Sequence, residues 1–138
     1  MSTYTTTGLV LSSHDFLEAD KIFSIYTNTH GKIEVRATGV RKIKSKLRAH
    51  LEPFSITHLM IAHGRRIDRL ASAINQKNYK KIKQNYQLLT INYQLLEITD
   101  QLTKHHHPDK RIFDILDEVI NYSEKLVGKQ CNNVTMKQ

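Results

Sequence analysis

The 138-residue chain contains no tryptophan, only two prolines and a single cysteine, Cys131. One cysteine excludes an intramolecular disulfide framework and a zinc site with four cysteine ligands. No apolar run approaches the ~20 residues that a membrane-spanning helix needs, and the N-terminal residues lack the basic stretch that opens a secretory signal peptide. We therefore expect a soluble, cytoplasmic protein that does not associate with a membrane.

Acidic residues are scarce in one part of the chain. Residues 1–83 hold 15 Lys and Arg against 6 Asp and Glu, whereas residues 84–138 hold 6 against 7. The whole formal net charge of +8 therefore belongs to the N-terminal part. Uniform basicity would indicate little beyond solubility, but a localised positive field predicts a polyanionic partner.

The sequence also lacks an arrangement of residues that predicts catalysis. Gly64 and its neighbours do not form a phosphate-binding glycine loop. Asp15, Glu18 and Asp20 precede a predicted strand without the spacing of metal ligands. We expect a binding protein rather than an enzyme, with no cofactor and no metal.

Five short segments in the first 77 residues have the composition or the alternation of β-strands: residues 6–12, 21–27, 32–38, 54–62 and 67–74. In the third segment Ile33, Val35 and Ala37 occupy alternate positions and are predicted to face the core. The fifth segment could instead form a short helix. Five short strands joined by turns suit a closed barrel, because closure removes exposed edges.

From Asn78 onward the apolar pattern has the period of a helix. Tyr79, Tyr86 and Tyr93 fall at heptad spacing, which we interpret as helix core rather than as a ladder for stacking bases. A second apolar stripe lies beside them and predicts a helix that is packed on more than one side; it consists of Leu88, Ile91, Leu95, Ile98 and Leu102.

Three consecutive histidines, at residues 105–107, and Pro108 interrupt this helix. Consecutive histidines on a loop do not converge on one ion, so we expect a polar interhelical loop and not a metal site. A second helix is predicted to begin near Asp109 and to end at Gly128. The expected α+β architecture is a five-stranded barrel over residues 1–77, an α-helical domain over 78–128 and a polar tail over 129–138.

Positive charge is concentrated in the segment from Gly31 to Phe54. Between residues 32 and 48 the only acidic residue is Glu34. A strand that leads into a cationic loop predicts salt-sensitive contact with nucleic-acid phosphates and little sequence preference. We expect these contacts from Lys32, Arg36, Arg41, Lys42, Lys44, Lys46 and Arg48, and a second contribution from the turn that contains Arg65 and Arg66, with Arg69 nearby.

Aromatic side chains can add base stacking to such contacts. In a regular strand over residues 21–27, Phe23 and Tyr26 lie on opposite faces, so we expect one of them to face outward.

An ordered series of short pieces runs through about residues 6–56. The pieces are Gly8-Leu9-Val10-Leu11, Glu18-Ala19-Asp20-Lys21-Ile22, Thr27 followed by Gly31-Lys32, Ala37-Thr38-Gly39-Val40-Arg41-Lys42, Ser45-Lys46-Leu47-Arg48 and Leu51-Glu52-Pro53-Phe54. In these pieces, and more loosely from Ile112 to Leu116, the chain resembles the bacterial recombination-mediator protein family RecO.

The resemblance implies an oligonucleotide-binding (OB) barrel followed by an α-helical domain. It also implies a role in recombinational DNA repair in the RecF pathway: binding of single- and double-stranded DNA, annealing of complementary strands, and work with RecR, single-strand-binding protein and RecF in loading recombinase. A bacterial, nucleoid-associated location follows from that role. Glu18 and Asp20 are implied as turn and pairing residues. Some family members bind zinc through a later cysteine-bearing segment, which a lone Cys131 does not support.

Two other interpretations of the basic segment remain open. It could receive the acidic tails of other proteins in an interaction adaptor, or the barrel could bind RNA, which residue types alone do not separate from DNA.

Overall fold

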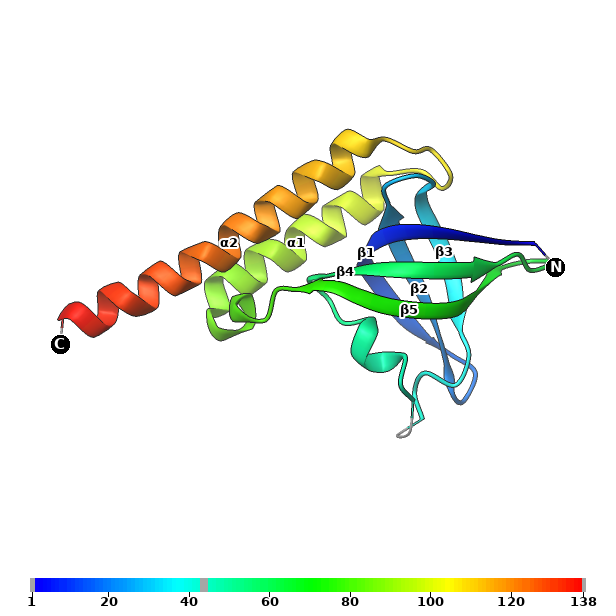
Figure 1. Ribbon diagram of the computed structural model, residues 1–138, viewed down its shortest axis with the longest axis horizontal. Helices are drawn as coiled ribbons and strands as arrows, with labels where there is room; N and C mark the ends of the chain where they lie inside the picture. The colour runs from blue at the N-terminus through cyan, green and yellow to red at the C-terminus, as the bar shows by residue number, and fades with distance from the viewer. Residues whose placement is uncertain (1, 43–44, 138) are drawn as a thin grey trace.

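The computed structural model describes residues 2–42 and 45–137, and only the backbone of residues 128–137. Its N-terminal part is a closed barrel with the strand order β1-β2-β3-β5-β4 (Figure 1). The strands are β1 (Thr3–Phe16), β2 (Asp20–Thr27), β3 (Gly31–Ala37), β4 (Ser55–Ala62) and β5 (Asp68–Asn78). The predicted α+β class, an OB-type barrel followed by helices, is confirmed, and the fifth segment is a strand.

Two antiparallel helices follow the barrel, α1 (Tyr86–Leu102) and α2 (Lys110–Lys137), and Figure 1 shows them side by side. The prediction that helix begins at Asn78 is wrong, because β5 extends to that residue and a 3-10 turn, η2 (Lys81–Gln84), follows. The Asn85 side chain accepts a hydrogen bond from the backbone N–H of Leu88 and so caps α1. α2 continues past Gly128, where we predicted its end. No helix in the described part of the chain is long and apolar enough to cross a membrane.

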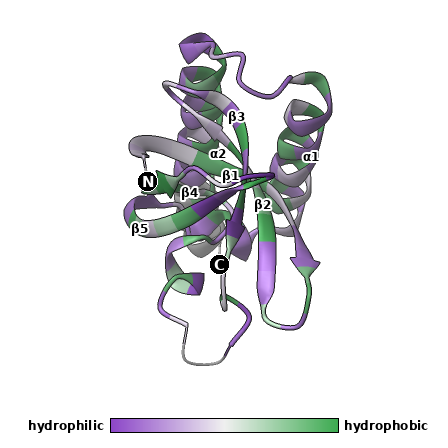
Figure 2. Cartoon of the chain, turned by 90° about the vertical axis from the view of Figure 1, so that its right-hand side faces the viewer, coloured by the Kyte–Doolittle hydropathy of each residue, from purple (hydrophilic) through white to green (hydrophobic). Residues whose placement is uncertain are grey.

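The barrel interior is filled by side chains that alternate along the strands. Ile33, Val35 and Ala37 are fully buried, as their spacing predicts. They join a core with Phe23 and Ile25 from β2, among others. Figure 2 shows hydrophobic segments on both helices as well as on the strands, which indicates that the barrel interior is not the only core.

A second core lies between the outside of the barrel and the helical pair. The side chains of Leu9 and Tyr26 point out of the barrel on this side. They pack in one cluster with Leu96 of α1 and Ile120 of α2. The Tyr26 hydroxyl donates to the backbone O of Asp109 at 3.2 Å. Phe23 and Tyr26 thus lie on opposite faces of β2, as predicted, but the helices bury the outward-facing Tyr26, so neither ring is exposed to stack on a base.

The outer face of the helices is less well covered than the sequence predicts. Tyr79 is buried but lies in the link between β5 and η2, and Tyr86 is 81% exposed and Tyr93 45% exposed, so the interpretation of the three tyrosines as helix core is wrong. Within the second stripe, Ile91, Ile98 and Leu102 are also exposed. α1 therefore buries one side only among the residues that the structure describes.

The loop between α1 and α2 packs on the turn between β2 and β3. Gly31 has a φ of +67°, and a Cβ built there would lie 2.7 Å from the backbone C of His107, so only glycine fits. The His106 backbone N–H donates to the Lys32 O at 2.9 Å. The histidine run lies in this interhelical loop, as predicted.

Candidate nucleic-acid interface

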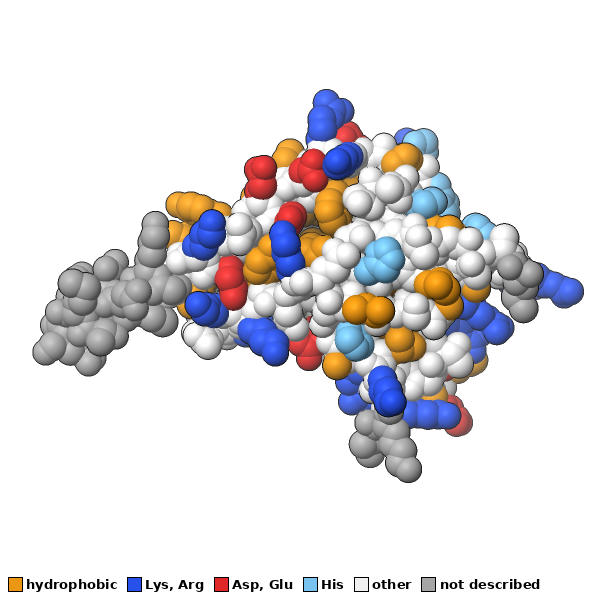
Figure 3. Space-filling view, viewed as in Figure 1, with side chains coloured by type: hydrophobic (Ala, Val, Ile, Leu, Met, Phe, Trp, Pro, Cys, Tyr) orange, Lys and Arg blue, Asp and Glu red, His pale blue; other side chains and the backbone are white. Residues whose placement is uncertain are grey.

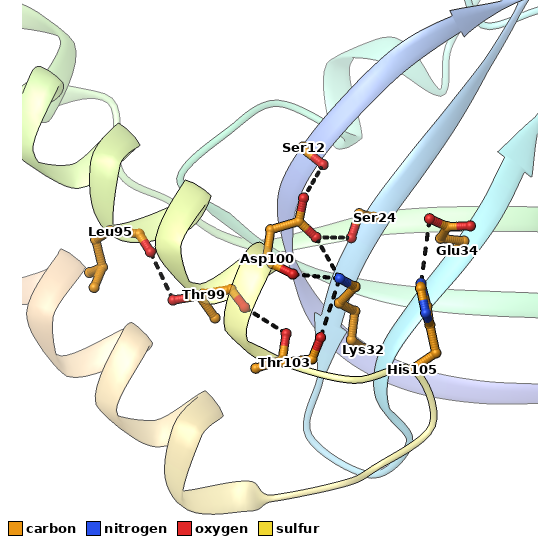
Figure 4. Close-up of polar contacts among 9 residues, drawn as sticks. All are labelled: Ser12, Ser24, Lys32, Glu34, Leu95, Thr99, Asp100, Thr103 and His105. Atoms are coloured by element: carbon orange, nitrogen blue, oxygen red, sulfur yellow. Dashed lines mark hydrogen bonds and ion pairs between the residues drawn. The ribbon is translucent and has the colours of Figure 1, made fainter.

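Lys32, the first basic residue of β3, lies under the helices rather than on an open surface (Figure 4). Its Nζ is 3.0 Å from Oδ1 of Asp100 on α1. The same Nζ donates to the backbone O of Asp100 at 2.5 Å and to that of Thr103 at 3.4 Å. These carbonyls belong to the C-terminal end of α1, where a cation complements the helix dipole. The charge of Lys32 therefore stabilises the contact between β3 and α1.

Asp100 is held from the barrel side as well. The hydroxyls of Ser12 and Ser24 donate to its two carboxylate oxygens at 2.8 and 2.7 Å. Burial raises the pKa of Asp100, but the hydrogen bonds from Ser24, Lys32 and Ser12 outweigh it and leave this pKa below its ordinary value. Because Lys32 is buried and neutralised by a carboxylate that stays ionised, we leave it out of the interface.

Arg36, on the same side of β3, lies beyond the helices and is paired with Asp20. Its Nε and Nη2 approach Oδ2 of Asp20 at 2.7 and 2.5 Å, and the Gly39 backbone N–H donates to Oδ1 at 2.7 Å. The Gly39 hydrogen bond and then Arg36 hold the pKa of Asp20 below its usual range. The guanidinium also stands 4.8 Å from the ring centre of Phe16. Asp20 is a pairing residue, as the resemblance implies.

The loop between β3 and β4 is held by two of the predicted contact residues. Arg48 donates to the backbone oxygens of Val40, Arg41 and Lys42 and so ties the first residues of the loop to Arg48. Arg41 donates from Nη1 to the Leu17 O at 3.2 Å, and its Nη2 lies 3.4 Å from Oδ2 of an exposed Asp15. Both guanidinium groups remain at the surface while they order the loop.

Two other cations of this loop are not engaged in this way. Lys42 and Lys46 are exposed and form no ion pair with a residue that the structure describes. Lys44, also a predicted contact residue, lies outside the described residues. Exposed cations without a carboxylate partner are the ones that a phosphate can bind without competition.

A second basic group lies at the loop between β4 and β5. Arg65 and Arg66 are exposed there, and Arg69 is exposed at the start of β5. Arg69 is directly opposite Arg36 in the parallel pairing of β3 with β5, so this pairing connects the two basic groups. Figure 3 shows Lys and Arg side chains at the right-hand end of the barrel and along its lower right edge.

Comparison with known proteins identifies the family. The family model described as recombination protein O, N terminal, matches residues 1–79. The chain belongs to the RecO family.

Several curated RecO relatives extend the similarity into the helices. A DNA repair protein RecO from Rubrobacter xylanophilus is 30% identical over 125 residues, 91% of this chain and 50% of the relative. The one from Trichodesmium erythraeum is 34% identical over 126 residues, 91% of this chain and 44% of the relative. The one from Bifidobacterium longum subsp. infantis is 45% identical over 73 residues, 53% of this chain and 30% of the relative. The chain spans about half the length, or less, of these RecO relatives.

OB-folds bind oligonucleotides on the face of strands 2 and 3 and through the loops that join strands 1–2 and 4–5. In this RecO chain the C-terminal end of α1 covers the Lys32 part of that face, whereas Arg36, with 24% of its side chain exposed, lies at the other end of β3. Sequence reasoning did not single out Lys21, which lies beside Asp15 at the open end. Lys21 comes to lie beside Asp15 only through the pairing of β1 with β2, and the sequence alone does not show this pairing. In the described ranges no group of three or more His, Cys, Asp or Glu could hold a metal ion.

Proposed function

We propose that this RecO chain is a non-catalytic DNA-binding protein of recombinational DNA repair. It binds single- and double-stranded DNA and anneals complementary strands, and it helps RecR to load recombinase. One observation carries the proposal: exposed cations without described carboxylate partners flank the open part of an OB-type face. These are Lys42, Lys46, Arg65, Arg66 and Arg69. Membership of the RecO family supports DNA as the polyanion.

Annealing follows from the placement of the cations at two separate loops. Two complementary strands repel each other through their phosphates, and each phosphate that binds a Lys or Arg releases condensed counterions. The β3–β4 loop and the β4–β5 loop can each neutralise one backbone, with Arg36 and Arg69 between them. Lower repulsion brings the bases of the two strands within pairing distance.

The helical pair has a different part in the proposal. Through Lys32 and Asp100 it braces the barrel (residues 1–77), which is the DNA-binding unit. The helical domain (residues 78–128) then offers surface to protein partners, which for a RecO protein are RecR and, further, single-strand-binding protein and RecF. A nucleoid-associated, cytoplasmic location fits these partners.

A strand-annealing assay on the purified 138-residue chain tests the proposal. The Lys42→Glu/Lys46→Glu variant should fold normally but anneal at least tenfold more slowly at low salt, because each reversal replaces attraction for phosphate with repulsion. The matched control is Lys110→Glu/Lys125→Glu, which makes the same charge change at exposed positions of α2.

Three outcomes would contradict the proposal or part of it. Equal annealing by both variants would place the site elsewhere. Weak DNA binding beside tight RecR binding would favour an adaptor for acidic protein tails. Tighter binding of RNA than of DNA of matched length would favour an RNA-binding barrel.

A further inference from the structure

A cavity of 570 Å³ opens at the end of the barrel, between the β1–β2 hairpin and the β3–β4 loop. Mouths of β-barrels are common ligand sites, and pockets for small ligands have volumes of roughly 300–1,000 Å³. The proposed function, which relies on phosphate contacts at the surface, does not use this space.

The floor of the cavity is apolar and rigid. Phe23, Val40 and Leu51 line it and are each at most 5% exposed, and all three belong to the barrel core. Pro53 adds a half-buried ring at the side. Arg48 fixes the loop wall through its hydrogen bonds to loop carbonyls. A flat apolar ring can therefore enter without a rearrangement of the core.

The rim of the cavity is charged. Ser13 pairs with Phe23 and Asp15 with Lys21 in the β1–β2 register, so these four side chains project to the same side of the hairpin. Lys21 Nζ and Arg41 Nη2 lie 3.9 and 3.4 Å from the two carboxylate oxygens of Asp15. Both pairs are exposed and loose, so a phosphate can replace the carboxylate between the two cations.

An apolar slot beside two cations matches a nucleotide: a base with hydrophobic faces joined to a phosphate. We propose that this cavity receives one unpaired base of a single DNA strand, while Lys21 and Arg41 bind an adjacent phosphate in place of Asp15. Ser13 and Glu52 line the wall, where their oxygens can meet the polar edge of the base. The inference rests on the proposed function and adds to it a preference for single strands, because a paired base reaches the cavity only after unpairing.

Filling the cavity without changing charge tests this site. Ser13→Trp places an indole over the floor, and its matched control is Gln94→Trp, which adds the same uncharged ring at an exposed position of α1. Binding of an oligo-dT strand and of a duplex of equal length is measured by fluorescence anisotropy at one salt concentration. We expect Ser13→Trp to weaken single-strand binding at least tenfold and duplex binding less than twofold, and Gln94→Trp to change neither.

A second measurement needs no variant and so does not depend on folding. The wild-type chain should bind an oligonucleotide made of abasic sites at least tenfold more weakly than oligo-dT, although both carry the same phosphates. Equal affinity for these two strands would overturn the site. So would a folded Ser13→Trp variant whose affinity for the single strand is unchanged, or one that loses as much affinity for the duplex as for the single strand. Failure of the wild-type chain to bind any DNA would instead overturn the proposed function together with this site.

Discussion

Lys32 and Arg36 project from the same side of β3, yet their surroundings differ. The Lys32 side chain is 10% exposed and is enclosed by Asp100 and the C-terminal end of α1. Arg36 lies past the edge of the helices, where Asp20 orients it and where Arg69 of the next strand stands beside it. One end of the strand joins the barrel to the helices, and the other end faces solvent between two basic loops.

This difference separates two uses of positive charge that look identical in the sequence. A buried cation must be paired, because the cost of removing it from water is offset only by close partners. An exposed cation adds little to stability but contributes to the field that attracts a polyanion. Substitutions at the Lys32 end of β3 should therefore lower stability, and substitutions of the exposed cations at the other end should lower DNA affinity.

The largest effect is expected at the Lys32 end, on stability. Asp100→Ala leaves the buried Lys32 ammonium without its carboxylate and Ser12 and Ser24 without their acceptor. Loss of one partner of a buried pair costs about 3 kcal/mol, which lowers the Tm of a chain of this size by about 10 °C. Thermal unfolding followed by circular dichroism measures this loss.

A double variant identifies the cause of that loss. Lys32→Met/Asp100→Ala removes the buried charge together with its partner, so its Tm should lie above that of Asp100→Ala alone. If the double variant is less stable than the single one by the full cost of Lys32→Met, the two side chains are not coupled and the pairing argument is wrong.

The second-largest effect is expected on DNA affinity, where variants at the two ends of β3 can be compared directly. Arg66→Met/Arg69→Met removes two exposed cations at the open end and should weaken single-strand binding about tenfold at low salt. The slope of the logarithm of the binding constant against the logarithm of the salt concentration should fall by about 1.4, because each phosphate contact on a single strand contributes about 0.7. Lys32→Met should leave affinity and slope unchanged while it lowers the Tm. Anisotropy titrations between low and moderate salt measure both quantities. A loss of affinity in a folded Lys32→Met variant would show that the buried lysine does serve the DNA.

A smaller effect is expected from acid at the Arg36 end. The folded pKa of Asp20 is lowered by Gly39 and Arg36, so its contribution to stability is fully present above the unfolded pKa of about 3.9 and is lost as the pH falls through the folded pKa. Asp20→Asn should thus lower the Tm at pH 7, and its difference from the wild type should shrink at lower pH. Asp114→Asn, at an exposed position of α2, should change the Tm little throughout. A difference for Asp20→Asn that is the same at pH 7 and at pH 3 would contradict the linkage.

The sequence predicts the barrel well because strand alternation is local. Ile33, Val35 and Ala37 are buried as their period of two requires. The start of α1 is not predicted, because Tyr79 and Ile82 continue the helical spacing although they belong to the link after β5 and to η2. There the η2 backbone is held by a distant residue, Glu124, whose carboxylate accepts from the N–H groups of Lys81 and Ile82.

The candidate site is predicted only in part, because charge is visible in the sequence and its partners are not. Lys32 and Lys42 look equivalent in a basic run, but one meets Asp100, which is 68 residues away in the chain, and the other meets solvent. The parallel contact that places Arg69 beside Arg36 is equally non-local. Exposure and pairing, which decide whether a cation is free for phosphate, appear only with the fold.

The smallest effect concerns Asp15, which holds Lys21 and Arg41 at the open end in the place that a phosphate would take. Exposed pairs of this kind contribute about 0–1 kcal/mol, so Asp15→Asn should leave the Tm nearly unchanged. It should also tighten single-strand binding about two- to threefold, because two cations lose a competitor and the strand loses a repelling charge. Glu118→Gln makes the same charge change on the exposed surface of α2 and should not alter affinity beyond its small effect on net charge. Equal affinity for Asp15→Asn and Glu118→Gln would mean that Asp15 does not compete with phosphate, and the open end of β3 would then bind DNA without the hairpin rim.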